Sequence, residues 1–384
     1  MIRRATDRVS FPGRMTGLSI VELLIAMVLG LSLAAGVVEI YTGNDATERS
    51  RDANARIQEN GRFALSYLNQ ELHAAGHLGC QSNTDDGNTN STLDTPPADF
   101  QPEMGLQGWE ANGTDPGDVF NSLDGVATVS STNGSWGTSG GNVMPALQVV
   151  PGSDIVRVWN TSGDIGRLNG VTTGANPVVN ISAINIVAGD VLMLNDCEHI
   201  DWVQACSVSS GASGTLNVTI SSACSPGNLT SPPITANVGA EVTKLEGTVL
   251  YVGKRNNTAG NTPALFRARL GTTASPTVVE ELIEGVESLQ VLYGINTDED
   301  SRNAVDTYLP ADQIPAGDWG RVISVRLSLL MQSIEDSIVP APQAYQFNGV
   351  MYDGQGANGN LPADLRLRRV FTSTISLRNR ALGL

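Results

Sequence analysis

The chain contains few histidines, few aromatic residues and an excess of acidic over basic residues. Its 384 residues include three histidines and only 5% Phe, Trp and Tyr, which leaves little material for His-based metal or acid–base sites. With 23 Lys and Arg against 39 Asp and Glu, the formal net charge is −16, so no basic patch is expected that could bind nucleic acid. The chain also lacks a phosphate-binding loop, a dinucleotide-binding fingerprint and an H-E-x-x-H zinc motif. These absences argue against an enzyme and against a bound cofactor.

The length and composition nevertheless predict a folded protein. A hydrophobic content of 41% is too high for a disordered chain. The 41 glycines and the low aromatic content indicate long polar loops, and the length allows one large domain or two smaller ones.

The N-terminal region predicts a membrane anchor. Residues 18–38 form an apolar run with one charge, Glu22, and this run is long enough to cross a bilayer as a helix. The positive residues before it place the N-terminus in the cytoplasm and the remainder on the other side of the membrane; they are Arg3, Arg4, Arg8 and Arg14. A secretory signal cut near Ala34–Gly36, or a simple anchor with a stray acid, is the alternative.

The residues around the start of this run resemble the type IV prepilin signature. Gly17 precedes the apolar Leu18, and Glu22 follows near the start of the span, where a carboxylate is costly and usually functional. The resemblance implies cleavage after Gly17 by a prepilin peptidase and N-methylation of Leu18, although most members have Phe at that position. It also implies that Glu22 pairs with the N-terminal amine of a neighbouring subunit.

A second, amphipathic helix segment is expected to follow. Ile57, Ala64, Leu68 and Leu72 recur at helical spacing, Gly76 is the predicted C-cap, and a weak point is predicted at Thr42–Asp45. We therefore expect a leader at 1–17, a transmembrane and stalk helix at 18–79, and a head at 80–384.

The head is expected to be rich in β-structure, with a loop-rich stretch at 81–142 where Asn, Thr, Ser, Gly and Asp dominate. A short helical turn is predicted at Glu280–Glu287. Strands are predicted from short Val-, Ile- and Thr-rich runs and from period-two alternation, at Ala146–Val150, Ile155–Trp159, Val178–Ile184, Asp190–Leu194, Gly214–Ile220, Val242–Tyr251, Ala264–Leu270, Ser288–Ile295, Arg321–Gln332 and Arg368–Arg378. The fold class is therefore α+β, with a long N-terminal helix packed on a β-rich head.

Four segments resemble the PilW family of type IV pilus minor pilins. They are Ala55–Cys80 (ARIQENGRFALSYLNQELHAAGHLGC), Glu284–Asp300, Trp319–Ser333 and Arg368–Arg380. The resemblance implies a pilin-like structural protein that takes part in pilus assembly in a priming or tip complex. It implies a single-pass inner-membrane protein with a periplasmic head, later part of the filament or its tip at the cell surface. The implied partners are other minor pilins, the major pilin, a PilY-type tip adhesin and the prepilin peptidase, with roles in adhesion and twitching motility.

Two other readings stay open. A type II secretion pseudopilin similar to GspJ shares the leader and a β head. A membrane-anchored adhesin, contacting a surface through residues 81–142, is the second.

Four cysteines follow the predicted span, at Cys80, Cys197, Cys206 and Cys224. In an oxidising compartment they allow two disulfides in three connectivities. The contexts LGC and NDCE resemble the recurring pair of the PilW family, which favours Cys80–Cys197 with Cys206–Cys224. A Cys197–Cys206 loop with Cys80–Cys224, or a zinc site from Cys197, His199 and Cys206, is the alternative.

Three weaker patterns complete the candidates. Asn296, Asp298, Asp300 and Asp306 offer alternating oxygen ligands for calcium, but Ser301 and Thr307 stand where an EF-hand loop has Gly and Glu. A solvated acidic loop is the plainer interpretation. Gly137–Gly141 matches G-x-S-x-G without a strand before it or a helix after it. His73 and His77 lie four residues apart near the helix end, so they could face one side and bind a metal, but a capping or packing role is the expected one.

Overall fold

A computed structural model describes residues 17, 19–80, 89–96, 100–119, 127–129, 136–137, 147–257, 262–270, 276–297, 304–315, 317–354, 361–377 and 379. The chain divides into two compact units, Met1–Asp52 and Ala53–Leu384. The fold is α+β, with one long helix and several β-sheets.

The long helix α1 runs from Ile20 to Ala74 without interruption. The sequence suggested a weak point at Thr42–Asp45, but this stretch is helical, and the Thr42 hydroxyl donates a hydrogen bond of 3.0 Å to the Val38 carbonyl. The helix ends as expected near Gly76, which has a φ of +67° and donates its backbone N–H to the Trp159 carbonyl at 2.9 Å.

The larger sheet has twelve strands among the described residues. Its main path is β1 (Thr89–Ser91), β9 (Ile200–Gln204), β8 (Val191–Asn195), β12 (Glu241–Lys254), β6 (Ile155–Val171), β7 (Val178–Ser182), β11 (Thr215–Thr219) and β10 (Ser207–Ser210). Branches from this path are β13 (Pro263–Leu270), which pairs with β12 and β14 (Pro276–Glu284), and β2 (Leu106–Ala111), which pairs with β6 and β4 (Trp136–Gly137).

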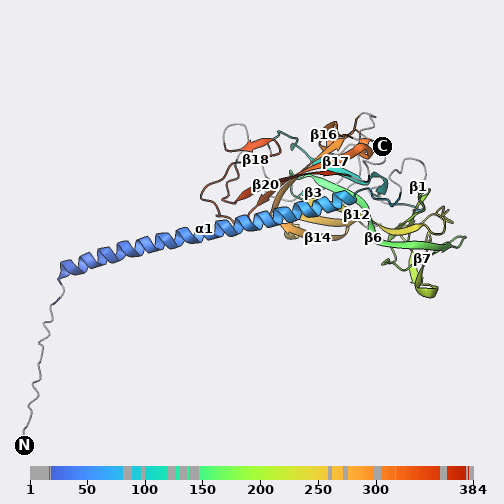
Figure 1. The fold of residues 1–384 in the computed structure, drawn as a ribbon, viewed down its shortest axis with the longest axis horizontal. Helices are drawn as coiled ribbons and strands as arrows, with labels where there is room; N and C mark the ends of the chain where they lie inside the picture. Colours follow the sequence, from blue (N-terminus) through green and yellow to red (C-terminus); the bar gives the residue numbers. More distant parts are fainter. Residues whose placement is uncertain are drawn as a thin grey trace, which may run out of the picture. The chain divides into compact units, whose positions relative to one another are not determined.

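Two long strands connect separate parts of the core. Val156 and Val158, near the start of β6, belong to the main core, whereas Leu168 near its end belongs to a second core built from β6, β7, β8, β11 and β12. Figure 1 shows β6 and β12 running from the centre of the head towards β7. Alternation of buried and exposed residues in the distal half of β6 fits its one-sided packing there.

The C-terminal part forms a four-stranded sheet in the order β16 (Thr307–Leu309), β15 (Val286–Ile295), β17 (Val322–Gln332) and β20 (Arg368–Ser376). The part of α1 from Ala53 to Ala74, its head half, lies on one face of these strands (Figure 1). There Ala64, Leu68 and Leu72 join the main core. The hairpin of β18 (Tyr345–Phe347) and β19 (Val350–Tyr352) packs against Leu330 and Val370. The remaining elements are β3 (Ala127–Val129) paired with β5 (Leu147–Val149), and the 3₁₀ turns Pro102–Met104, Ala212–Gly214, Arg255–Asn257, Ala311–Gln313 and Asp318–Arg321.

One local expectation is wrong. The helical turn expected at Glu280–Glu287 is the end of β14, a turn at Gly285 and the start of β15. Gly285 adopts a φ of +88°, and an added Cβ would lie 2.8 Å from the Gln332 carbonyl, so the sharp change of direction depends on this glycine. The loop-rich region 81–142 also contains β2, all six residues of which are buried in the larger sheet.

Candidate functional site

The first turns of α1 expose an apolar surface that begins beside an acidic residue. Glu22 lies in the first turn, and the large apolar side chains from Ile20 to Tyr41 are at least half exposed, from 52% for Leu23 to 77% for Ile20. By length and composition, α1 is able to cross a membrane, and no other helix in the described ranges passes that test. Gly17 is exposed, whereas Leu18 lies outside the described residues. Processing at Gly17 and Leu18 and the role of Glu22 therefore stay predictions.

The head half of α1 is held by polar contacts as well as by its apolar face. The Tyr67 hydroxyl accepts a hydrogen bond from Arg267 Nη1 at 2.7 Å, and Arg267 lies 3.9 Å from Glu71. The amide of Asn60 donates to the Glu284 carbonyl at 3.1 Å. Burial, reinforced by Glu71, raises the pKa of Tyr67, so the phenol stays protonated. The helix is thus attached to β13 and β14 along one flank.

Two disulfides, Cys80–Cys197 and Cys206–Cys224, connect the four cysteines. This is the connectivity that the family resemblance favours. The first joins the segment after α1 to the turn between β8 and β9, over a sequence separation of 117 residues. The alternative zinc site at Cys197, His199 and Cys206 is wrong, because a cysteine in a disulfide has no thiolate to offer a metal.

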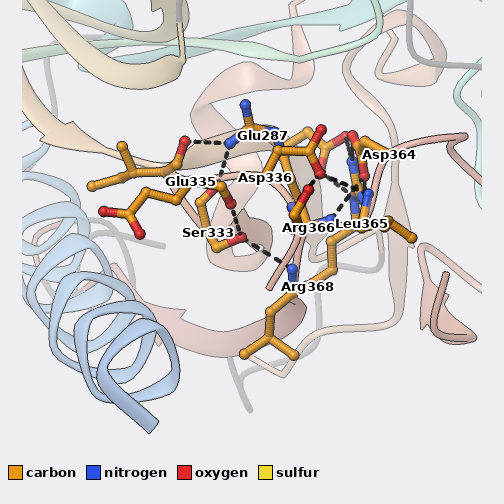
Figure 2. Close-up of polar contacts among 11 residues, drawn as sticks. Glu287, Ser333, Glu335, Asp336, Asp364, Leu365, Arg366 and Arg368 are labelled. Atoms are coloured by element: carbon orange, nitrogen blue, oxygen red, sulfur yellow. Dashed lines mark hydrogen bonds and ion pairs between the residues drawn. The ribbon is translucent and has the colours of Figure 1, made fainter. Parts of the chain in front are cut away.

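A buried ion network lies where the segment between β17 and β20, residues 333–367, leaves and rejoins the four-stranded sheet (Figure 2). Arg368 donates from Nε and Nη2 to the two oxygens of Glu287, at 2.7 and 3.1 Å, and from Nη1 and Nη2 to Asp364, at 2.6 and 2.8 Å. Its side chain is 6% exposed and that of Glu287 is 8% exposed. Burial raises the pKa of Glu287 while Arg368 opposes the shift; the two-point geometry fits an ionised pair.

Backbone contacts extend the same network. The Arg366 guanidinium donates to the carbonyls of Ser333 and Ile334, and the Ser333 hydroxyl accepts the Leu367 N–H at 3.0 Å. Asp336 accepts the Leu365 N–H at 2.8 Å (Figure 2). These bonds hold together the two ends of the segment that carries β18 and β19.

A second buried polar group was not foreseen from the sequence. Asp154 is 2% exposed and accepts backbone N–H bonds from Ala111 at 2.9 Å and Val291 at 2.8 Å. Near it, Glu110 on β2 is 4% exposed, and its Oε1 accepts the Thr114 hydroxyl at 3.2 Å. Burial and the neighbouring Asp154 raise the pKa of Glu110, and burial raises that of Asp154 against its two N–H bonds. We assign the proton to Glu110, because Asp154 receives the backbone donors.

The weaker sequence candidates are only partly covered by the described residues. Asn296 is 2% exposed, and Asp306 accepts bonds from the Thr297 N–H and hydroxyl at 2.6 and 2.9 Å. Asp298 and Asp300 lie outside the described residues, as do four of the five residues of Gly137–Gly141. Within the described ranges, no group of three or more His, Cys, Asp or Glu side chains is arranged to hold a metal ion. His73 and His77 are both exposed near the end of α1.

The buried polar pairs of the head cannot be recognised from the local sequence pattern. Glu287 and Arg368 lie 81 residues apart, and Glu110 and Asp154 come from separate strands and turns.

Comparison with known proteins supports the assignment made from the sequence. Residues 249–379 match the family model described as PilW, type IV pilus-assembly protein W. No curated protein sequence matches the chain. The matched region includes β13 to β17, β20 and the Arg368–Glu287 pair. The C-terminal third of the chain, residues 249–379, is therefore similar to the PilW family of type IV pilus-assembly proteins.

Proposed function

We propose that this protein is a minor pilin that takes part in type IV pilus assembly within a priming or tip complex. One combination carries the proposal: an exposed apolar helix with Glu22 in its first turn leads into a β-rich head that matches a pilus-assembly family. A helix with exposed apolar side chains on every face needs lipid or other helices around it. A pilus protein meets both environments, first in the membrane and then in the filament.

The N-terminus supplies the chemistry of assembly in this proposal. Cleavage after Gly17 creates a new amine at Leu18, four residues before Glu22. Inside an apolar helix bundle an unpaired carboxylate is costly, so Glu22 favours an arrangement that brings it to the amine of a neighbouring subunit. The head lies in the periplasm before assembly and at the pilus surface afterwards. Its partners are other minor pilins, the major pilin and a PilY-type tip adhesin.

Intact mass and N-terminal sequencing of protein from membranes, with and without the prepilin peptidase, test the first step. The expected product begins at N-methylated Leu18 and forms only with the peptidase. An uncut chain, or a cut near Gly36, would contradict the proposal.

A Glu22→Gln variant separates processing from assembly. We expect it to be cleaved after Gly17 and to fail to enter pili, because the amide cannot pair with the amine as an ion. The matched control is Glu39→Gln, at an exposed position further along α1. Recovery of Glu22→Gln with sheared pili at the level of the control would refute the assembly role of Glu22. Co-purification with type II secretion pseudopilins in place of type IV pilins would assign the protein to the other machine.

A further inference from the structure

A pocket on the head lies outside the ion network and the disulfides described above. Its volume is about 310 Å³, within the range of small-ligand sites. It lies over β12 and the end of β13, with Glu71 of α1 at one side and Phe100 and Trp159 at another. Most of its lining precedes residue 249, so the pocket is largely built by a part of the chain outside the family match.

One wall of the pocket is aromatic. Phe100 and Trp159 meet edge to face, with ring centroids 5.2 Å apart, and Phe100 remains partly exposed. Leu245 and Leu270 pack with the same pair. Such a wall offers a flat apolar surface to a ligand of limited size.

Four of the six charged residues that line the pocket lie within ion-pair distance of one another, and the lining holds as many acidic as basic side chains. Lys244 Nζ lies 2.9 Å from Asp190, and Arg267 is paired with Glu280 and lies 3.9 Å from Glu71. A ligand with a high charge of either sign would meet repulsion from one member of each pair. The pocket therefore favours a ligand without net charge.

Two side chains on the floor are available for hydrogen bonding. Glu246 and Thr248 are two residues apart on β12, so they lie on one face of the sheet. In the part of the chain that the structure describes, neither side chain has a hydrogen bond or an ion pair. Arg269 pairs in register with Thr248 across β12 and β13, which brings a planar guanidinium beside them.

We propose that this pocket binds a neutral saccharide ring. A pyranose carries hydroxyls around its edge, which donate to the Glu246 carboxylate and exchange hydrogen bonds with Thr248. The apolar C–H face of the ring packs on the flat apolar face of Phe100. An extended peptide fits less well, because its buried N–H and C=O groups would need partners that the aromatic wall does not provide. The binding activity is independent of the assembly role proposed above.

Saturation-transfer NMR on the full-length protein tests this proposal. The protein is held in an amine-oxide detergent, since a detergent with a sugar head group would compete. The probes are glucose, galactose, mannose, fucose, N-acetylglucosamine and N-acetylgalactosamine. We expect at least one of them to bind with a dissociation constant of about 1 mM, the order for a ligand with few heavy atoms.

Variants locate the binding. Glu246→Gln keeps the side-chain shape, and Phe100→Ala removes the aromatic wall; each is expected to weaken binding about tenfold. The control is Glu198→Gln, an exposed carboxylate in a separate hollow near Cys197, which should leave binding unchanged. A melting curve verifies that each variant is folded, and Glu246→Gln alone decides the question if Phe100→Ala does not fold.

Three results would overturn the proposal. The first is no transfer to any sugar of the panel. The second is transfer of equal strength in the wild type and Glu246→Gln. The third is Glu246-dependent transfer to lysine methyl ester with none to the sugars, which would make the pocket a site for a cation.

Discussion

Arg368 and Glu287 form a two-point ion pair, with nitrogen–oxygen distances of 2.7 and 3.1 Å, between strands whose residues lie 81 positions apart. Asp364 occupies the remaining donors of the guanidinium. The pair therefore links the start of β20 to the start of β15 and to the loop that precedes β20. A contact of this kind stabilises a particular arrangement of strands, and its loss leaves a charge without a partner in the interior.

Replacing Arg368 by Met should destabilise the head by about 3–5 kcal/mol, the usual cost of removing one partner of a buried pair. Urea unfolding of the full-length protein measures the change. The control is Arg255→Met, because Arg255 bonds Glu281 in the same bidentate manner but at the exposed surface, at 2.9 and 2.6 Å. We expect little change in the unfolding free energy of Arg255→Met. Equal losses in the two variants would mean that burial of the Arg368 pair has no energetic consequence.

The buried carboxyl pair predicts a dependence of stability on pH. The folded-state pKa of Glu110 is raised above its ordinary value of 4.5, so the folded protein binds a proton more tightly than the unfolded chain. The contribution of Glu110 to stability is fully present below pH 4.5 and is lost as the pH rises towards the folded-state pKa. Glu110→Gln, which is neutral at every pH, should therefore gain stability relative to the wild type as the pH increases.

Unfolding of both proteins at pH 5 and pH 8 gives the comparison. The unfolding free energy of Glu110→Gln minus that of the wild type should be larger at pH 8 than at pH 5 by at least about 1 kcal/mol, since one pKa unit corresponds to about 1.4 kcal/mol. Asp115 and Asp312 also face Glu110 and are unchanged in the variant. A difference that is the same at both pH values would show that Glu110 titrates normally in the folded state.

Gly61 sets the distance between α1 and β20. A Cβ at this position would lie 2.5 Å from the Phe371 ring, a contact that side chains do not tolerate. Gly61→Ala gains about 1 kcal/mol of helix propensity but forces α1 and Phe371 apart, and overpacking of this kind costs about 1–3 kcal/mol. We therefore expect a net loss in the unfolding free energy of the head.

The matched control is Gly43→Ala on the same helix, where an added Cβ has no neighbour within 4 Å. It should leave the head unfolding transition unchanged. If Gly61→Ala also has no effect, the close approach of α1 to β20 is not required for the packing of the head.

The sequence was sufficient for the elements with a regular pattern and insufficient for the contacts between them. The alternation in Arg321–Gln332 predicts β17, which spans Val322–Gln332, because one face of this strand is buried. A helical turn is predicted at Glu280–Glu287, but pairing with β13 decides the conformation of this segment, and Glu280 accepts a hydrogen bond from Arg267. The same limit applies to the pocket, where Phe100 and Glu246 meet only through the fold. Pairing between distant segments is a tertiary effect that local pattern does not encode.

The two disulfides should differ in their contribution to stability because they close loops of different length. In the chain-entropy account, a loop of 117 residues corresponds to about 5 kcal/mol and a loop of 18 residues to about 3 kcal/mol. Replacing Cys80 and Cys197 together by Ala should therefore destabilise the head more than replacing Cys206 and Cys224. Each pair is removed as a whole, so that no free thiol remains to form a wrong bridge, and unfolding is followed in the absence of reductant. The reverse order would indicate that the Cys80–Cys197 disulfide adds little stability beyond the contacts that Tyr67 and the apolar face of α1 already make. The role of this disulfide would then be to direct the chain after α1 to the turn between β8 and β9.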